Sequence, residues 1–71
     1  MSAVDVHIGA RIRKRRNELS LSQGKVGAAY GVSFQQIGKV ENGSNRIYAS
    51  QLWLIAQALG VPIGYFFEGL E

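Results

Sequence analysis

The sequence predicts an all-α domain of five helices in which the second and third helices form a helix-turn-helix. Three observations favour this fold. Apolar residues recur at helical spacing along the chain, glycines and serines separate the apolar segments, and the stretch from Gln23 to Val40 has the spacing of two short helices joined by a tight turn. With 71 residues, 46% of them hydrophobic, the chain is expected to form one small domain with a single core.

The first helix is expected over residues 5–19. The carboxylate of Asp5 can cap its N-terminus and suits the positive end of the helix dipole. Arg15 interrupts an otherwise apolar stripe, so its aliphatic stem should lie along the core while its guanidinium reaches water. The inner side of this helix is predicted to carry Ile8, Ile12, Arg15, Arg16 and Leu19.

The second helix is expected over residues 23–30. Leu21 should anchor the preceding break in the core, and Ser22 can act as the N-cap. Gly27 lies where the two helices of the motif approach most closely, which favours a small residue. Gly31 then ends the helix, because glycine adopts the left-handed conformation without steric cost.

The third helix is expected over residues 34–41. Ser33 can cap its N-terminus by accepting a hydrogen bond from a backbone N–H of the first turn. Asn42 and Gly43 end it, since both residue types tolerate a positive φ. The inward residues of the motif are predicted to be Val26 and Tyr30 on one helix and Ile37 and Val40 on the other.

Two further helices are expected after a polar connection. The fourth runs over residues 49–59 and is closed by Gly60, and the fifth runs over residues 63–67. Pro62 fits the first turn of the fifth helix, where a missing N–H costs nothing. The buried side of the fourth helix is predicted to carry Leu52, Ile55, Ala56 and Leu59.

The outer face of the third helix has the chemistry to read DNA bases. On a helical wheel Gln35 and Lys39 point outward, with Gln36 beside them. In the major groove, glutamine side chains pair with adenine and lysine side chains pair with guanine. Phe34 either lies against a thymine methyl or a deoxyribose, or covers the edge of the core. Gly38 either lets the backbone approach the bases or has no role there.

Phosphate contacts are expected on both sides of this face. Gln23 begins the second helix, whose exposed N–H groups form an anion site, although an ordinary first-turn residue would also fit there. Asn42, Ser44 and Arg46 form a second rim beyond the third helix. Asn42 can also serve as a helix C-cap, and Arg46 as a solvated loop charge.

The chain is basic, with eight Lys and Arg against five Asp and Glu, a net charge of +3 and a sequence pI near 9.7. A basic domain attracts polyanions, although a basic run on a helix is also compatible with a merely solvated face. Together with the helix-turn-helix pattern, the charge favours duplex DNA as the partner. Five of the eight cations are clustered: Arg11, Arg13, Lys14, Arg15 and Arg16.

Several short motifs occur in an order that is specific when they are taken together. They are Ile8-Gly9 with Arg11-Ile12-Arg13, Leu21-Ser22-Gln23, Gly31-Val32-Ser33, Glu41-Asn42-Gly43, and Ile55-Ala56 with Ala58-Leu59-Gly60-Val61. In these motifs the chain resembles the Cro and phage-repressor family, also called the xenobiotic-response-element family, over residues 8–67. The resemblance implies a compact five-helix, lambda-repressor-like domain of a transcriptional regulator, expected to be a repressor, that binds a palindromic operator as a homodimer.

The resemblance also implies roles for individual residues when it is carried over position by position. An internal ion pair between Arg16 and Glu41 would fasten the first helix to the end of the third. The implied base contacts are Ser33, Phe34, Gln35 and Lys39. The implied phosphate contacts are Gln23, Asn42, Ser44 and Arg46.

The chain departs from the family pattern at three positions. Ser20 replaces a common glycine, and Arg15 takes a place that is often leucine. Gly38 replaces a side chain that often helps to read bases, so specificity should depend more heavily on Gln35 and Lys39.

Apolar side chains in the C-terminal part favour a dimer interface. Leu54 lies opposite the buried side of its helix, and Phe66 and Phe67 are adjacent and cannot both face inward. A two-fold dimer would bury this surface and place two recognition helices about 34 Å apart, one turn of DNA. Alternatively, Trp53 lies flat on the domain and Leu54 is a lone exposed residue. The predicted interface comprises Trp53, Leu54, Tyr65 and Phe67.

Several function classes are not expected. The chain has no cysteine for disulfides or thiolate metal sites, and no cofactor or metal is predicted. His7 is the only histidine and is expected at the surface, without a catalytic constellation, so an enzyme is not expected. No apolar stretch approaches the roughly 20 residues of a membrane span and no signal peptide is evident, which favours the cytoplasm.

One alternative function remains open, an antitoxin or protein-interaction module built on the same fold. Binding to DNA phosphates should weaken steeply with salt, whereas an apolar protein interface should respond little. The terminal pair Leu70-Glu71 resembles a remnant of cloning. The chain stops soon after its last expected helix, which leaves open whether an effector or oligomerisation region has been removed.

Overall fold

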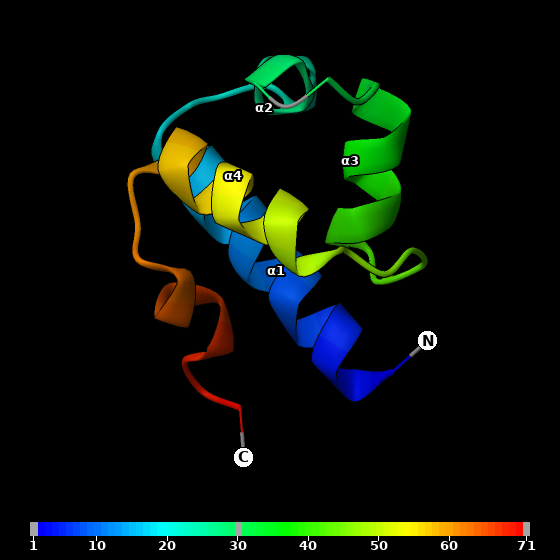
Figure 1. Ribbon diagram of the computed structural model, residues 1–71, viewed down its shortest axis with the longest axis vertical. Helices are drawn as coiled ribbons and strands as arrows, with labels where there is room; N and C mark the ends of the chain where they lie inside the picture. The colour runs from blue at the N-terminus through cyan, green and yellow to red at the C-terminus, as the bar shows by residue number, and fades with distance from the viewer. Residues whose placement is uncertain (1, 30, 71) are drawn as a thin grey trace.

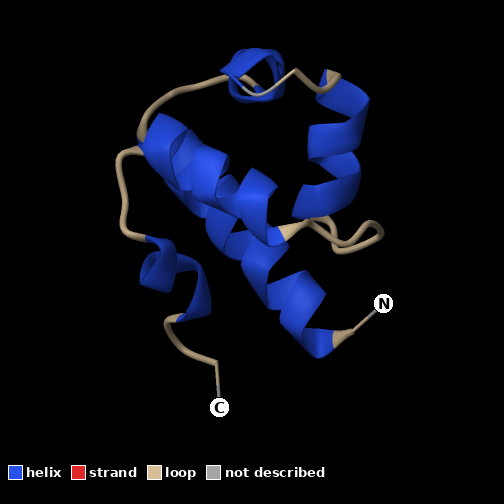
Figure 2. Ribbon diagram, in the orientation of Figure 1, coloured by secondary structure: helices blue, strands red, loops and turns tan. Residues whose placement is uncertain are grey.

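The computed structural model describes residues 2–29 and 31–70, which contain helices and loops but no strand (Figure 2). The all-α prediction is therefore confirmed, but the fifth element is a short 3-10 helix rather than an α-helix, with a bond from Tyr65 N–H to the Pro62 carbonyl of 3.0 Å. The elements are α1 (Ala3–Glu18), α2 (Gln23–Ala29), α3 (Phe34–Glu41), α4 (Ala49–Leu59) and the 3-10 helix η1 (Ile63–Phe67).

Helix α1 begins two residues earlier than predicted because Ser2, and not Asp5, is its N-cap. The Ser2 hydroxyl accepts from the Asp5 N–H at 3.0 Å and donates to the Asp5 carboxylate at 2.7 Å. Asp5 instead occupies the first turn, where its charge suits the helix dipole. The helix also ends earlier, at Glu18, so the predicted inner position of Leu19 is wrong and this side chain is 39% exposed.

The break between α1 and α2 follows the sequence prediction closely. Leu21 is partly buried against the core, and the Ser22 hydroxyl accepts from the Lys25 N–H at 3.1 Å as an N-cap. Ser20 has φ of +57°, the left-handed region that favours glycine. The position where the resemblance expects glycine therefore keeps the backbone conformation of glycine although it carries a serine.

The turn between α2 and α3 is as tight as the spacing predicted. Gly31 has φ of +77°, and a Cβ at Gly27 would lie 2.5 Å from the Val32 carbonyl oxygen, so close contact requires glycine there. Ser33 caps α3 by accepting from the Gln36 N–H at 3.3 Å. The predicted inward residue Tyr30, at the expected end of the second helix, lies outside the described residues.

The crossing of α1 over the end of α3 depends on Gly9, which the sequence analysis did not single out. A Cβ on Gly9 would overlap the Val40 carbonyl oxygen and lie 2.6 Å from the Glu41 carbonyl oxygen. The two helix backbones therefore touch at this residue. The end of α3 is then closed by Gly43, with φ of +81°.

Helix α4 ends at Gly60 as predicted, with φ of +68°. Pro62 lies one residue before η1 in an extended conformation, and not within its first turn. The guanidinium of Arg15 was predicted to reach water, but its Nε donates to the Leu59 carbonyl at 3.0 Å. Arg15 thus satisfies one of the carbonyls that the end of α4 leaves free.

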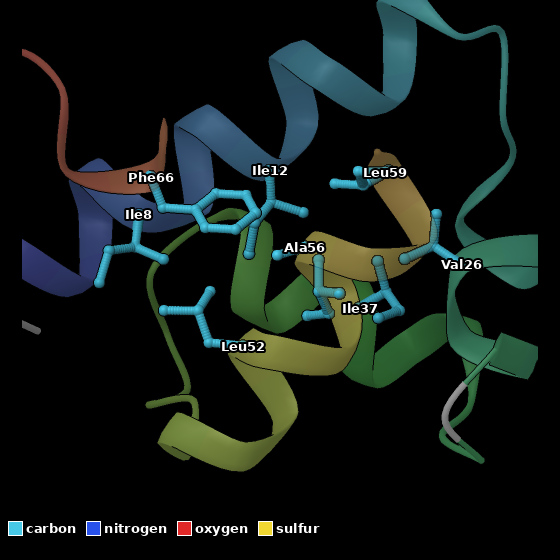
Figure 3. Close-up of a cluster of buried hydrophobic side chains, with 9 residues drawn as sticks. Ile8, Ile12, Val26, Ile37, Leu52, Ala56, Leu59 and Phe66 are labelled. Carbon is cyan, nitrogen blue, oxygen red and sulfur yellow. The ribbon is translucent and has the colours of Figure 1, made fainter. Parts of the chain in front are cut away.

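The core lies between the α1–α4 pair and the elements that flank it (Figure 3). Helix α3 and η1 flank this pair on opposite sides, and α2 crosses one end of it (Figure 1). Phe66 from η1 packs beside Ile8 and Ile12 of α1. The buried apolar residues are Ile8, Ile12, Val26, Ile37, Leu52, Ile55, Ala56, Leu59 and Phe66.

Candidate nucleic-acid interface

Helix α3 presents polar side chains on the face opposite its buried one. Ile37 is buried and anchors the helix, while Gln35, Gln36 and Lys39 are exposed. Phe34 is 56% exposed, which makes its ring available for an apolar contact and argues against a role in covering the core. Each side chain on this face can reach a neighbouring molecule without unfolding the domain.

Ser33, at the start of α3, is exposed but already has a structural role. Its hydroxyl oxygen accepts the Gln36 N–H at 3.3 Å. A serine hydroxyl can still donate one hydrogen bond while it accepts another. Ser33 therefore combines helix capping with a free donor at the N-terminal end of the polar face.

Beneath the polar face, Arg16 of α1 and Glu41 of α3 are held together as the family resemblance implied. Arg16 Nε lies 2.6 Å from Glu41 Oε2, and Nη2 lies 3.0 Å from Oε1. The bond to Glu41 raises the pKa of Arg16, so the guanidinium is charged at any ordinary pH. Gln23, half-buried at the start of α2, donates from Nε2 to the same carboxylate at 3.1 Å.

The loop after α3 carries the second group of candidate phosphate ligands. Asn42 is the C-cap of α3, and its side-chain oxygen accepts from the Ser44 N–H at 2.9 Å, which leaves its amide nitrogen as a donor. Arg46 has an 89% exposed side chain, and its Nε is 3.9 Å from the Asp5 carboxylate. Asp5 is a neighbour of this loop that the sequence analysis missed, because it lies 41 positions away along the chain.

A small groove of about 140 Å³ runs along the same side of the molecule, between α3 and the start of α4. Its lining combines apolar side chains with polar and charged ones, Arg46 among them. Tyr48 lines this groove and is 75% exposed, but the sequence analysis did not propose it as a binding residue. The signal that could have identified it is an aromatic residue within a polar loop. The lining residues are Val32, Gln36, Ile37, Val40, Asn45, Arg46, Ile47, Tyr48 and Gln51.

The cluster of five cations on α1 serves mainly the fold of the domain. Arg11 donates from Nε to the Tyr65 carbonyl at 3.0 Å and pairs with Glu68 at 3.1 Å, while Arg15 and Arg16 bind α4 and α3. Arg13 and Lys14 are exposed. Much of the charge that the sequence offered to a polyanion is therefore used inside the protein.

The predicted dimer residues fall into two groups. Trp53, Leu54 and Phe67 are exposed, at 55%, 40% and 42%, whereas the neighbouring Phe66 is fully buried, so only one of the adjacent phenylalanines faces inward. Tyr65 is half-buried instead, with the Arg11 guanidinium 3.9 Å from its ring centre. The exposed part of the predicted interface thus comes from α4 and the end of η1, and Tyr65 belongs mostly to the domain itself.

His7 is not a free surface residue. Its Nε2 lies 2.6 Å from the Glu68 carbonyl oxygen, so this nitrogen donates and the C-terminal segment is tied to α1. Among the described residues, no group of three or more acidic or histidine side chains could hold a metal ion. The same part of the chain has no helix that is long and apolar enough to cross a bilayer.

A short helix packed across a second one, with a tight glycine turn between them and an exposed polar face on the second, defines a helix-turn-helix domain. Comparison with known families agrees, because the profile of the HTH_3 helix-turn-helix family matches residues 12–66. The chain belongs to this family. The resemblance to Cro and phage-repressor proteins is thereby confirmed.

One curated relative is an uncharacterised transcriptional regulator in the ATPase CF(0) region of Rhodospirillum rubrum. It is 57% identical over 68 residues, which cover 96% of this chain and 63% of the relative. The chain thus spans less than two thirds of that protein.

Two solved structures have the same fold. The restriction-modification controller protein C.AhdI from Aeromonas hydrophila is 27% identical with a TM-score of 0.86, over 93% of this chain and all of that one. The P22 c2 repressor, crystallised with a synthetic operator, is 31% identical with a TM-score of 0.79, over 87% of this chain and 94% of that one.

Proposed function

We propose that this chain is the DNA-binding domain of a sequence-specific transcriptional regulator and that α3 enters the major groove of duplex DNA. The observation that supports this most directly is the outward face of α3, where Gln35 and Lys39 are exposed on a helix anchored by buried Ile37. A groove about 12 Å wide admits one such helix. In this proposal Gln35 and Lys39 read base edges, and Phe34 and Ser33 make the contacts at the start of the helix.

Phosphate contacts in this proposal come from both ends of the interface. Arg46 is the strongest candidate, since its charged side chain is 89% exposed beside the end of α3. Asn42 and Ser44 belong to the same loop, and Gln23 is the first residue of α2, where backbone N–H groups of the first turn would also donate to a phosphate. These contacts fix the position of the domain on DNA but carry no sequence information directly.

The proposal is tested by selecting bound duplexes from a random pool and then comparing variants on the selected and on random DNA. Gln35→Ala and Lys39→Ala should each lose about 1–3 kcal/mol of preference for the selected duplex. Arg46→Ala should weaken binding to all duplexes alike and lower the slope of log affinity against log salt by about 1. Equal losses on both duplexes from both groups of variants would contradict these assignments.

Salt also separates DNA binding from the alternative of a protein-interaction or antitoxin module. Affinity for the selected duplex should fall steeply as salt rises, because phosphate binding releases counterions. If no duplex is enriched and no binding responds to salt, the DNA-binding proposal is wrong. We propose that the protein binds DNA without catalysing a reaction. We also propose that it acts in the cytoplasm, where a bacterial operator is found.

We further propose that the domain acts as a homodimer on a palindromic operator and that it represses transcription. The exposed apolar side chains Trp53, Leu54 and Phe67 support a self-complementary surface away from α3, with Tyr65 at its edge. Two recognition helices would then face successive turns of DNA, about 34 Å apart.

The dimer is tested by sedimentation velocity over a range of concentrations, with and without the selected duplex. We expect the protein to associate and Leu54→Glu to abolish this association. Phe34→Ala, which changes another exposed apolar residue, on α3, should leave it intact. A monomer up to high micromolar concentration in both conditions would refute the dimer. A reporter gene placed behind the selected duplex then tests repression, which predicts lower expression in the presence of the protein.

A further inference from the structure

The side chain of Gln23 lies across α3 instead of extending freely from the start of α2. Its Nε2 donates to Glu41 Oε1 at 3.1 Å, although the two residues are 18 positions apart. The Glu41 carboxylate is itself 3% exposed and belongs to the last residue of α3. Gln23 thus joins the N-terminus of one motif helix to the C-terminus of the other.

The chemistry of Glu41 decides which way the Gln23 amide faces. An ionised carboxylate only accepts hydrogen bonds and has about four acceptor positions. Arg16 occupies two of them, at 2.6 and 3.0 Å, and Gln23 uses a third. Only the nitrogen end of the amide can therefore face Glu41. The second N–H of that nitrogen remains as a donor.

The Gln23 amide lies over Gly38. A Cβ on Gly38 would be in ordinary van der Waals contact with this amide, 3.6 Å from Nε2 and 3.7 Å from Oε1, so only a side chain longer than that of alanine would displace it. Residues 38 and 41 are three positions apart and share one side of α3. The Gln23 amide therefore limits the size of the side chain that position 38 can carry, although it does not require glycine there.

We propose that Glu41 is a positioning residue for DNA binding: it holds the Gln23 amide at a fixed offset from the base-reading face of α3, so that its second N–H meets a DNA phosphate. This inference rests on the proposed function, since it assigns the way one of the phosphate contacts is built. Glu41 itself is buried beneath the interface. It acts through Gln23 and touches no DNA.

The test is a double-mutant cycle in a protein that keeps its fold. Removing Glu41 alone would leave Arg16 unpaired, so both are replaced in the variant Arg16→Met with Glu41→Met, where apolar side chains of similar length fill the space. Circular dichroism and thermal melting establish that this variant is folded at the assay temperature. Gln23→Met, which removes the amide and keeps the chain length, is then made in both backgrounds.

In the natural background we expect Gln23→Met to lower affinity about tenfold on selected and random duplexes alike, the cost of one hydrogen bond to a charged group. Without the Arg16–Glu41 pair, the same change should cost less than about twofold, because the amide is no longer held. The salt slope should not change, since glutamine carries no charge, whereas Arg46→Ala serves as the control that lowers it. An equal loss in both backgrounds would overturn the proposal.

A measurement without DNA keeps this inference separate from the proposed function. In the natural protein, the side-chain N–H that Gln23 donates to Glu41 should exchange with water more slowly than the side-chain N–H protons of the exposed Gln35, and this protection should be lost in the Arg16→Met, Glu41→Met variant. Side-chain N–H protons of Gln23 that exchange as fast as those of Gln35 in the natural protein would overturn the positioning role, whether or not DNA binds. If the Gln23 N–H is protected but no duplex is bound, the proposed function fails and the DNA-binding role of Glu41 fails with it.

Discussion

Arg16 and Glu41 form a two-bond ion pair that ties α1 to the end of α3, with side chains only 12% and 3% exposed. Arg16 also donates from Nη1 to the Leu21 carbonyl at 2.9 Å, so one guanidinium holds three segments of the chain. Burying such an ion pair costs free energy, because both charges lose their hydration. Removing only one partner costs more, because the other charge is then buried without a counterion. Its two partners are 25 positions apart in the sequence.

Replacing one partner of this pair should destabilise the domain strongly. Arg16→Met leaves a buried carboxylate without its cation, and we expect a loss of about 3–5 kcal/mol in the free energy of unfolding. The double change Arg16→Met with Glu41→Met should recover most of that loss, because no charge remains buried. Urea unfolding of the three proteins measures both effects, and additive losses in the double variant would contradict this account.

The contribution of Arg16 should not depend on pH in the neutral to alkaline range. The bond to Glu41 raises the pKa of Arg16 in the folded protein. A group with a raised pKa stabilises fully below its unfolded pKa and loses this effect only as pH rises through the folded one, which here is above the ordinary arginine range. The stability difference between the natural protein and the paired methionine variant should therefore be constant from about pH 7 to about pH 9. A decline across this window would be inconsistent with this assignment.

Two glycines in helices should respond to alanine in opposite directions. Gly9→Ala places a Cβ against the Val40 and Glu41 carbonyl oxygens, and we expect a loss of about 3 kcal/mol or more from the forced separation of α1 and α3. Gly24→Ala is the matched control in α2, where the added Cβ would lie 3.8 Å from the Ser22 hydroxyl oxygen. It should stabilise the protein by about 0.5–1 kcal/mol through helix propensity. Thermal melting distinguishes the two, and similar shifts would show that the close approach at Gly9 is unimportant.

The negative charge of Asp5 should lower the affinity of Arg46 for DNA phosphates. Its carboxylate lies 3.9 Å from Arg46 Nε, beside the loop proposed to contact the DNA backbone. Asp5→Asn keeps an oxygen that can accept from the Ser2 hydroxyl but removes the charge, so affinity for all duplexes should rise about twofold to fivefold at low salt and less at high salt.

Glu18→Gln provides the control for this prediction, since it changes net charge equally at the opposite end of α1, where Glu18 pairs with Arg15 at 3.5 Å. Fluorescence anisotropy with a labelled duplex measures the DNA affinity of both variants. Equal gains from the two changes would mean that net charge alone is responsible and that Asp5 has no specific effect on Arg46.

The local features of the fold were predictable because they depend on residues that are close in sequence. Ser22 and Ser33 cap the helices that follow them, and Gly31 and Gly60 adopt the left-handed conformation. Each of the two capping contacts spans three positions, and the glycine conformations depend on a single residue. One local prediction failed at Asp5, because Ser2 offers a competing cap three residues earlier and the longer helix wins.

The long-range features were predictable only where a family resemblance implied them. That resemblance identified the Arg16–Glu41 pair. No spacing rule indicated that Arg15 would bind the end of α4, that His7 would bind the Glu68 carbonyl, or that Gly9 would touch α3. Such contacts depend on how whole helices cross, and helix crossing follows from the packing of many side chains at once.

The sequence by itself determined the helical class, the turn of the motif and the outward chemistry of α3, since helical periodicity and turn preferences are local properties of the chain. Only the tertiary structure decided which charged and polar groups remain available to a partner. Three arginines of the basic cluster are engaged within the protein and the Gln23 amide gives one of its two N–H groups to Glu41, whereas Arg46 and Lys39 are exposed. The reason is physical: a buried polar group must find a partner inside the fold, and that partner can come from any point along the chain.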